Sequence, residues 1–341
     1  MVGTALRHVW RHSFETMPLR LATTLAGSRV VAPCYHLVSA DAPVHVRHLY
    51  RCRSELEFRA EIDLLLRHFK PIALSELAKA IERDGSAPKD ALFLSVDDGF
   101  REAAEVIAPI CFEKGVPVTF FVNTAFLDNR TLCFRHKASI LIERCRLLGS
   151  DRSPRLLQDV GGFTSSGNPA EFFLSVPYRQ TEVLDFCAQL LDVDFAEYLL
   201  TERPYLTQEQ VERLLAKGFE IGGHSVDHPL YAELTLNEQL DQTRQCMDEI
   251  GLRFAFKTRA FAFPFVSDGV GLQFYRTVLS EGTAELIFCL GGEPTFCSSR
   301  LIQRFGVEGR QVLPLIELLR AEAGRKSLAY IRRWGRVGAP N

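Results

Sequence analysis

The stretch LFLSVDDGF, residues 92–100, places two adjacent carboxylates directly after a run of mostly apolar residues. The run has the length and composition of a buried strand, and Asp97 and Asp98 follow where that strand would end. Neighbouring like charges destabilise each other unless a positive group, often a metal ion, stands beside them. Gly99 permits the tight turn that would bring both carboxylates to the end of the strand. The sequence therefore predicts a positive partner close to the two aspartates.

Segments with the pattern of strands alternate with segments that have the pattern of helices. Apolar runs predict strands at 29–38, 70–74, 91–96, 116–127, 219–224, 258–265, 285–290 and 300–307. Apolar residues at helical spacing predict helices at 54–69, 75–85, 101–115, 206–218, 235–251 and 314–334. Ser54 and Thr207 precede two of these helices as expected N-caps. This alternation predicts an α/β fold, with a mainly parallel sheet or barrel wrapped by helices.

The alternation is interrupted between about residues 129 and 205, where the chain has a helical or irregular pattern. We interpret this stretch as an insertion or small lid between barrel strands. The expected organisation is a basic N-terminal arm at 1–28, a barrel at 29–310 that contains the insertion, and a basic C-terminal helix and tail at 311–341.

Composition places the chain among ordinary globular proteins. The 341 residues are 47% hydrophobic with a formal net charge of −2, which is enough to bury a sizeable core. Nine cysteines without any CxxC spacing favour buried thiols in a reducing compartment over a disulfide framework. The sequence shows no apolar run of transmembrane length and no signal-peptide pattern, so we expect a cytoplasmic location.

Positive charge is concentrated at the two ends of the chain. Residues 1–30 hold four arginines against one glutamate, and residues 320–341 hold six basic residues against one glutamate. With the aromatic residues Trp10, Phe14, Tyr330 and Trp334, these ends could lie on an anionic membrane surface, or they could be solvated helix faces and tails. The slightly negative total charge and the absence of a recognition motif argue against nucleic acid as a partner.

A second motif, HSVDHP, places His224 and His228 four residues apart after another predicted strand. On a helical turn this spacing would put both imidazoles on one face. Two histidines and a carboxylate form a common metal triad that leaves positions open for water and substrate. A simpler reading makes Asp97 and Asp98 a solvated cap of the next helix, but it leaves the histidines unexplained. Both motifs follow strands, where α/β barrels bind ligands.

The two motifs together resemble those of the NodB-type polysaccharide deacetylases, carbohydrate esterase family 4. SVDDGF is similar to the first motif, (T/S)FDDG, and HSVDHP to the second, H(S/T)xxH, in the same order. CYHLV, residues 34–38, resembles a YHxV stretch found early in many members. The resemblance spans about residues 30–310 and implies a distorted (β/α) barrel with a helical insertion.

The resemblance also implies a chemistry, the removal of an acetyl group from an N-acetylated sugar or a related amide. The implied ligands of one divalent metal are Asp98, His224 and His228. Zinc fits this set, which also accepts iron, cobalt or manganese. Asp97 would be the general base that takes a proton from the attacking water. Ser225 and Asp227 would orient the ligands.

The chain departs from the family pattern at two places. The third motif, RxP(Y/F), corresponds to AFPF with Ala262 at the arginine position, and Arg259 lies three residues earlier. The fifth motif, LxH, supplies the general acid, but this chain has no histidine after His228.

Three residues could take the place of that general acid. His36 ends the first predicted strand, His136 lies in the insertion, and Asp268 follows the third-motif strand and could act as an acid if burial raised its pKa. Each could equally be a structural residue or a solvated loop charge. Arg304, in a late strand, could hold a carboxylate.

Three functions remain open at this stage. A metal-dependent deacetylase in the cytoplasm would act on a glycan precursor, such as a nucleotide- or lipid-linked sugar, or on another amide. A barrel with altered chemistry would bind a metal and a glycan or metabolite without cleaving it; the missing arginine and histidine favour it, and Asp97 disfavours it. A metal-dependent phosphoesterase would need a further Asp/His cluster for a second metal, and the sequence shows none. No signal of an oligomeric state is present.

Overall fold

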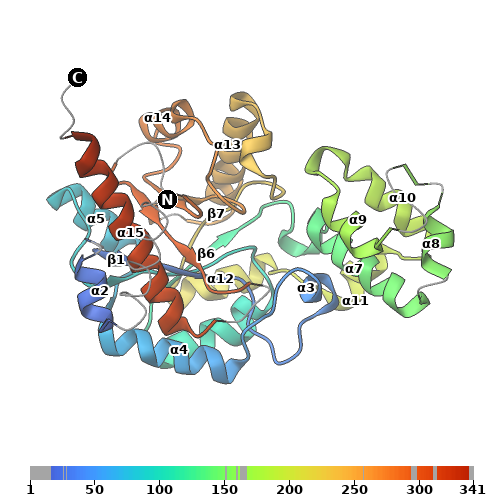
Figure 1. Ribbon diagram of the computed structural model, residues 1–341, viewed down its shortest axis with the longest axis horizontal. Helices are drawn as coiled ribbons and strands as arrows, with labels where there is room; N and C mark the ends of the chain where they lie inside the picture. The colour runs from blue at the N-terminus through green and yellow to red at the C-terminus, as the bar shows by residue number, and fades with distance from the viewer. Residues whose placement is uncertain are drawn as a thin grey trace, which may run out of the picture.

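The computed structural model describes residues 17–25, 27, 29–149, 152–158, 160–161, 167–255, 257–292, 298–309 and 313–337. A barrel wrapped by helices fills one part of the molecule, and a group of helices projects from one side of it (Figure 1). Trp10, Phe14 and Cys297 lie outside the described residues.

One parallel sheet forms the barrel. Its strands, in spatial order, are β10 (Leu301–Gln303), β9 (Leu286–Cys289), β8 (Ala260–Ala262), β7 (Glu220–Gly223), β6 (Val118–Val122), β5 (Leu94–Val96), β2 (Pro33–Tyr35) and β11 (Phe305–Gly306). Only Arg304 separates β10, which pairs with β9, from β11, which pairs with β2. This segment therefore joins both edges of the sheet and nearly closes it, which confirms the predicted barrel of the NodB type.

Three short strands extend the sheet at the end where the strands begin. They are β1 (Val30–Val31), β4 (Ala91–Leu92) and β3 (Lys70–Pro71), and they pair in parallel. Strand β1 ends one residue before β2, and β4 ends one residue before β5. The predicted runs at 29–38 and 91–96 therefore each form two consecutive strands. The polar motifs follow at the opposite end of the barrel.

Helices cover the outside of the barrel. They are α4 (Glu55–His68), α5 (Leu74–Asp84), α6 (Ala108–Glu113), α12 (Gln208–Ala216), α13 (Leu236–Arg253) and α14 (Leu272–Ser280). Capping boxes at Ser54 and Thr207 begin α4 and α12, as predicted. The predicted helix at 101–115 begins with a π-helical turn, Ala103–Ile107, next to Pro109, which lacks a backbone N–H.

Close contact between strands and helices requires small residues in β7. A Cβ added to Gly222 would lie 2.5 Å from the ring of Phe121 and 2.7 Å from the carbonyl oxygen of Ala260. Only glycine fits at this position, so it holds the strand that carries His224 against its neighbours.

The helical insertion packs around a hydrophobic core that it shares with segments at the end of the barrel, including Leu37, Val46 and Phe100. It contains α7 (Phe134–Leu148), α8 (Arg152–Leu157), α9 (Pro169–Ser175), α10 (Glu182–Leu190) and α11 (Phe195–Glu202), which lie together beside the barrel (Figure 1). The short helix α3 (Val44–Arg47), which follows β2, packs against α7. The buried Glu143 carboxylate pairs there with His48 and Arg47, so the loop after β2 is tied to the insertion.

The two described ends of the chain lie side by side. Helix α2 (Leu19–Leu25) packs against α15 (Leu315–Val337), and Arg320 Nε donates a hydrogen bond to the carbonyl of Met17. The eight cysteines within the described ranges are all buried and unpaired. No helix in the described part of the chain combines the length and the apolar character needed to cross a membrane.

Candidate active site

The two sequence motifs meet at the carboxyl ends of the barrel strands. Asp98 follows β5, and His224 follows β7, two strands away in the sheet. The Oδ1 atom of Asp98 lies 3.1 Å from Nε2 of His228 and 3.4 Å from Nε2 of His224. All three side chains are buried. The structure therefore brings together the three residues predicted to hold a metal.

Unusual backbone conformations produce this convergence. Asp98, Ser225, His228 and Phe265 all have positive φ angles, of 69°, 72°, 66° and 54°. Non-glycine residues adopt such angles at a cost in free energy, and they cluster at functional sites. The segment 224–228 is a loop and not a helical turn, and its two left-handed residues, Ser225 and His228, turn both imidazoles toward Asp98.

Hydrogen bonds orient the two histidines. Nδ1 of His224 lies 2.9 Å from the carbonyl oxygen of Ala262, so it carries the proton and leaves the Nε2 lone pair directed at the site. The backbone N–H of His228 donates to Oγ of Ser225. Phe265 packs edge-on against the His228 ring, with 4.4 Å between centroids.

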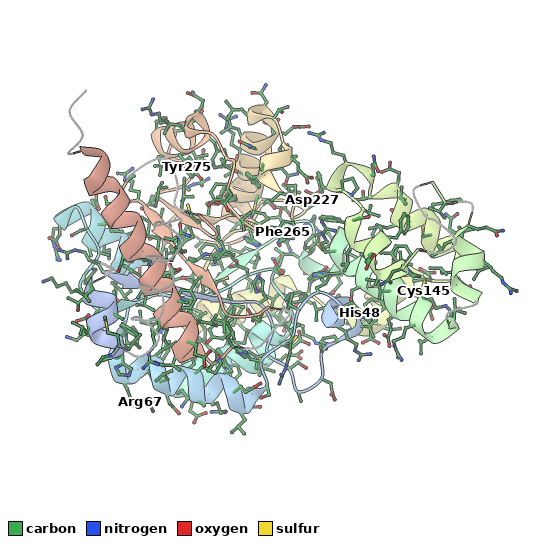
Figure 2. The ribbon with its side chains drawn as sticks, viewed as in Figure 1. His48, Arg67, Cys145, Asp227, Phe265 and Tyr275 are labelled. Carbon is green, nitrogen blue, oxygen red and sulfur yellow. The ribbon has the colours of Figure 1, made fainter. Side chains whose placement is uncertain are left out.

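Asp227 has a different environment from the one expected. Its carboxylate accepts hydrogen bonds from Tyr178 in the insertion and from Gln242 on α13. Figure 2 shows Asp227 and Phe265 on the side of the barrel that faces the insertion. Asp227 therefore links the histidine loop to the insertion.

The donor set fits a divalent cation. Oδ1 of Asp98 is buried and has no hydrogen-bond partner among the described residues, although the two imidazole nitrogens lie close to it. Burial disfavours charge on both His228 and Asp98, but their mutual attraction outweighs it. The pKa of His228 is raised to about 9, and the pKa of Asp98 is held well below its usual range. The imidazole of His228 therefore holds a proton between itself and Asp98, and a bound metal ion would take the place of that proton.

Asp97 has a different positive partner, the wholly buried Arg304. The guanidinium donates two hydrogen bonds to the carboxylate, from Nη1 to Oδ1 at 2.7 Å and from Nη2 to Oδ2 at 2.8 Å. Cys34 Sγ also donates to Oδ2, and Arg304 Nη1 contacts Ser95 Oγ. Burial raises the pKa of Asp97, but Arg304, His224 and His36 together outweigh it, and the net pKa lies below the usual value. The two adjacent aspartates are thus neutralised separately.

The structure contains a second cluster of possible metal ligands, which corrects the expectation that none exists. Ligand atoms of Cys34, His36 and Asp97 all lie within 4.8 Å of one another. The Asp97 carboxylate is already occupied by Arg304, and His36 is paired with Glu308. A cation here would face the positive guanidinium at close range, so this cluster does not support a two-metal phosphoesterase.

His36 and Glu308 form a histidine–carboxylate pair at the edge of the site. Nδ1 of His36 lies 3.1 Å from Oε2 of Glu308, and the backbone N–H of His36 donates to Oε1. Burial lowers the pKa of His36, but Glu308, with help from Asp98 and Asp97, raises it to about 9. Sequence reasoning missed Glu308, although a carboxylate directly after a strand, as in the DDG motif, is a recognisable signal.

The other candidates for the general acid have different surroundings. His136 is buried at the start of α7, where its Nδ1 accepts a hydrogen bond from Tyr205, and burial lowers its pKa to about 3. Asp268 is exposed, so the condition of burial attached to its acid role is not met, and it accepts a hydrogen bond from the backbone of Gly292. Arg259 precedes β8 and pairs with Asp248, at the opposite end of that strand from Ala262.

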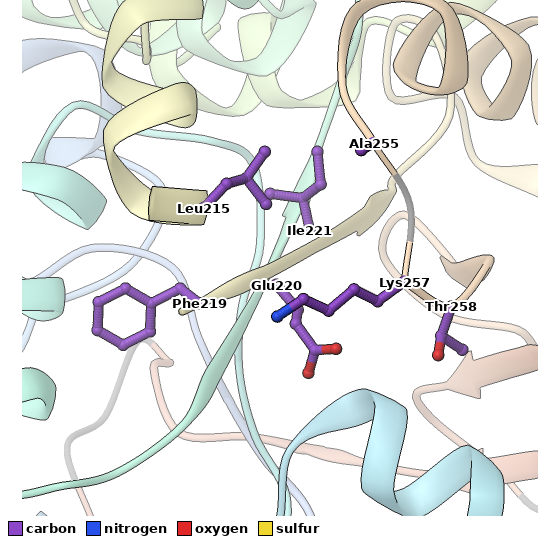
Figure 3. Close-up of a pocket in the computed structure, with 7 residues that line it drawn as sticks. All are labelled: Leu215, Phe219, Glu220, Ile221, Ala255, Lys257 and Thr258. Carbon is purple, nitrogen blue, oxygen red and sulfur yellow. The ribbon is translucent and has the colours of Figure 1, made fainter. Parts of the chain in front are cut away.

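A cavity of about 230 Å³ lies at the opposite end of β7 from His224. It is lined mainly by apolar side chains, together with Glu220, Lys257 and Thr258 (Figure 3). The Glu220 carboxylate accepts hydrogen bonds from the backbone of Ser75 in the first turn of α5. This cavity is separate from the metal ligands.

Comparison with known proteins identifies the family. Residues 84–270, which include both motifs, match the family model described as polysaccharide deacetylase. The chain belongs to this family. The match confirms the resemblance to the NodB-type deacetylases carried by the DDG and HxxxH motifs. No curated protein matches the chain.

Solved structures of deacetylases share the fold. The Streptococcus pyogenes deacetylase PplD, in complex with acetate, is 12% identical, with a TM-score of 0.54 over 86% of this chain and 98% of that one. IcaB from Ammonifex degensii is 15% identical, with a TM-score of 0.52 over 88% of this chain and 98% of that one. At these identities the likeness concerns the barrel and the arrangement of its elements.

As a polysaccharide deacetylase family member, the chain departs from the motif pattern at Ala262, and its Asp97 contacts an arginine from another part of the barrel. The contact comes from the strand that closes the barrel, not from β8. Arg304, which the sequence indicates only as a residue that could hold a carboxylate, is therefore a central residue of the site.

We expect Arg304→Met to lower the free energy of unfolding by about 3–5 kcal/mol at pH 7, because it leaves a buried carboxylate without its partner. Urea denaturation measures the change. Arg244→Met is the matched control: Arg244 pairs with Glu281 at the surface, where solvent screens the pair, so its loss should change the free energy of unfolding far less. Equal effects of the two substitutions would contradict a central role for the buried pair.

The difference in the free energy of unfolding between wild type and Arg304→Met should depend on pH. Because the pKa of Asp97 is lowered in the folded protein, its contribution to stability is present above its unfolded pKa, about 3.9, and is lost as pH falls through the folded value. The deficit of Arg304→Met should therefore shrink as pH falls below about 4. A deficit independent of pH would indicate lost packing instead.

Proposed function

We propose that the protein is a metal-dependent hydrolase that removes an acetyl group from an N-acetylated sugar or a related amide. Membership of the polysaccharide deacetylase family supports the reaction class. The convergence of Asp98, His224 and His228 on one point, with Asp97 beside them, is the observation that carries the proposal.

The three ligands suit a single divalent metal, with zinc as our first choice. When bound, the metal supplies Lewis acidity that activates water and polarises the acyl carbonyl. Two nitrogens and one oxygen leave coordination positions free for water and substrate.

Asp97 is the proposed general base. Its Oδ2 atom faces the metal ligands, 3.7 Å from Nε2 of His224, and would accept the proton of the attacking water. Arg304 keeps this carboxylate ionised and fixes its orientation through two hydrogen bonds. The same pairing lowers its basicity, so proton transfer depends on close positioning of the water.

His36 is the proposed general acid. Its pKa of about 9 keeps the imidazole protonated at neutral pH, and Glu308 occupies Nδ1. Nε2 is then the atom that would protonate the leaving amine. The side chain is 21% exposed, whereas that of Asp98 is 8% exposed, so His36 lies on the more open side of the site.

The barrel with altered chemistry remains the alternative proposal. It drew support from Ala262 and from the absence of a histidine after His228. Arg304 and the His36–Glu308 pair offer the two missing chemical groups from other strands. This arrangement favours hydrolysis over binding alone.

We propose that the chain resides in the cytoplasm. Its substrate would then be a glycan precursor, such as a nucleotide- or lipid-linked N-acetylated sugar. The buried, unpaired thiols are consistent with a reducing compartment. The proposed boundaries are a barrel at 29–310 with the insertion at about 129–205, flanked by basic ends.

Metal content and acetate release test the proposal together. We expect purified wild type to hold about one metal per chain by mass spectrometry and to release acetate from members of a panel of N-acetylated sugars. Combined Asp98→Ala and His228→Ala should abolish both, because two of the three ligands are gone. Asp97→Asn should keep the metal and lose about 10²–10⁴-fold in rate, as expected for a general base.

His48→Ala is the matched control for these substitutions, because His48 pairs with Glu143 in the insertion and should leave the metal content unchanged. Metal without acetate release would favour the binding barrel. If reconstituted wild type takes up no metal, the assignment of the site is wrong.

The acid role of His36 predicts a particular pH dependence. The rate should fall as pH rises through about 9, because the imidazole then loses its proton. Glu308→Gln removes the negative charge at 3.1 Å, so the pKa falls and the basic limb of the profile should move to lower pH by about one unit or more. An unmoved basic limb would exclude His36 as the acid.

We also propose that α2 and α15 dock on an anionic membrane surface. The chain from 320 to 336 carries six basic residues against Glu322 alone, and packing places α2 beside it. Leu21 and Leu25, one helical turn apart on α2, are 49% and 52% exposed. Exposed apolar side chains on a helix that packs against a segment of basic sequence suit an interfacial helix.

Vesicle sedimentation tests this contact. Wild type should bind vesicles that contain phosphatidylglycerol, bind neutral vesicles poorly, and dissociate at high salt. Leu21→Ser with Leu25→Ser should weaken binding about tenfold or more by removing two anchors. The control is Leu56→Ser with Leu252→Ser, which changes two exposed leucines on other helices. An equal loss of vesicle binding in both double variants would contradict a specific membrane-binding face on α2.

A further inference from the structure

The hydroxyl of Tyr50 is an unpaired polar group next to the candidate active site. Tyr50 lies in the loop between α3 and α4, and its oxygen is buried without a hydrogen-bond partner among the described residues. Buried hydroxyls are nearly always paired, because an unpaired one loses its bonds to water without replacement. An exception beside a catalytic centre points to a partner that arrives with the substrate.

The position of the phenol ties it to the reacting groups. Its ring centroid lies 5.5 Å from that of His36. Burial, and then the negative charges of Asp98 and Glu308, raise the pKa of Tyr50 well above its usual value. The phenol therefore keeps its proton and can act only as a neutral hydrogen-bond donor or acceptor. It stands near both a metal ligand and the general acid.

The loop that carries Tyr50 is held in place on both sides. The backbone N–H of Tyr50 donates to the carbonyl of Val46 in α3. The N–H of Arg51 donates to the carbonyl of Gly309, next to Glu308. On the other side, Glu143 of α7 pairs with Arg47 and His48. A donor fixed in this way can be preorganised for a reacting atom.

We propose that Tyr50 donates a hydrogen bond to the acyl oxygen of the bound amide and is a further catalytic residue. This proposal rests on the proposed deacetylase function. Negative charge develops on that oxygen when water adds to the carbonyl, so a buried donor there stabilises the transition state more than the ground state. The donor retains its proton throughout, and no bond to Tyr50 forms or breaks.

Tyr50→Phe tests the proposal, because it removes the hydroxyl and keeps the ring. Acetate release should show kcat lower by about 10²–10³-fold, with KM within about threefold and the metal content unchanged. Tyr198→Phe is the matched control: it removes the hydroxyl of a half-buried tyrosine on α11, paired with His45, and should leave kcat unchanged. An unchanged kcat in Tyr50→Phe, or an effect on KM alone, would overturn the assignment.

A binding measurement separates this proposal from the proposed function. Acetohydroxamate carries a carbonyl oxygen in place of the acyl oxygen, and calorimetry with metal-loaded protein gives its affinity. Tyr50→Phe should weaken binding about tenfold, and Tyr198→Phe should not. If wild type binds the probe but releases no acetate from any amide, the deacetylase function fails while the probe still decides the role of Tyr50. Equal affinity of wild type and Tyr50→Phe, or no binding by either, would overturn the role of Tyr50.

Discussion

The ion pair between Arg304 and Asp97 connects the closure of the barrel to the chemistry of its site. Arg304 is the single residue between β10 and β11, the strands that join the two edges of the sheet. A charged side chain without any exposure needs a partner, and Asp97, at the end of β5, provides it with two hydrogen bonds. Neither residue can occupy its position unless the barrel closes around both.

That pair also explains how two adjacent aspartates are tolerated. Asp97 and Asp98 point to different positive partners, one to a guanidinium and the other to two imidazoles. Environments that separate neighbouring carboxylates in this way allow them to take different roles. The left-handed backbone at Asp98 and Gly99 produces this divergence, with φ angles of 69° and 66°. A local turn therefore determines which carboxylate is available for a metal.

Sequence patterns predicted the elements of this site better than its contacts. The apolar runs and the DDG and HxxxH motifs are local, so the strands, the barrel and the convergence of Asp98 with the two histidines could be inferred. The pairing of Arg304 with Asp97 spans 207 residues, and that of Glu308 with His36 spans 272, so no local pattern indicates them. The two histidines converge through a loop and not through a helical turn, and their spacing alone does not reveal its left-handed residues.

A closed barrel also accounts for the substitution at Ala262. All strand ends surround one site, so a group absent from one strand can be provided by another. Ala262 still contributes through its carbonyl, which holds Nδ1 of His224, a role that needs no side chain. The guanidinium comes instead from the closing segment, two strands away in the sheet. The buried Asp97 carboxylate requires a positive partner, and the topology of the barrel allows more than one position in the sequence to supply it.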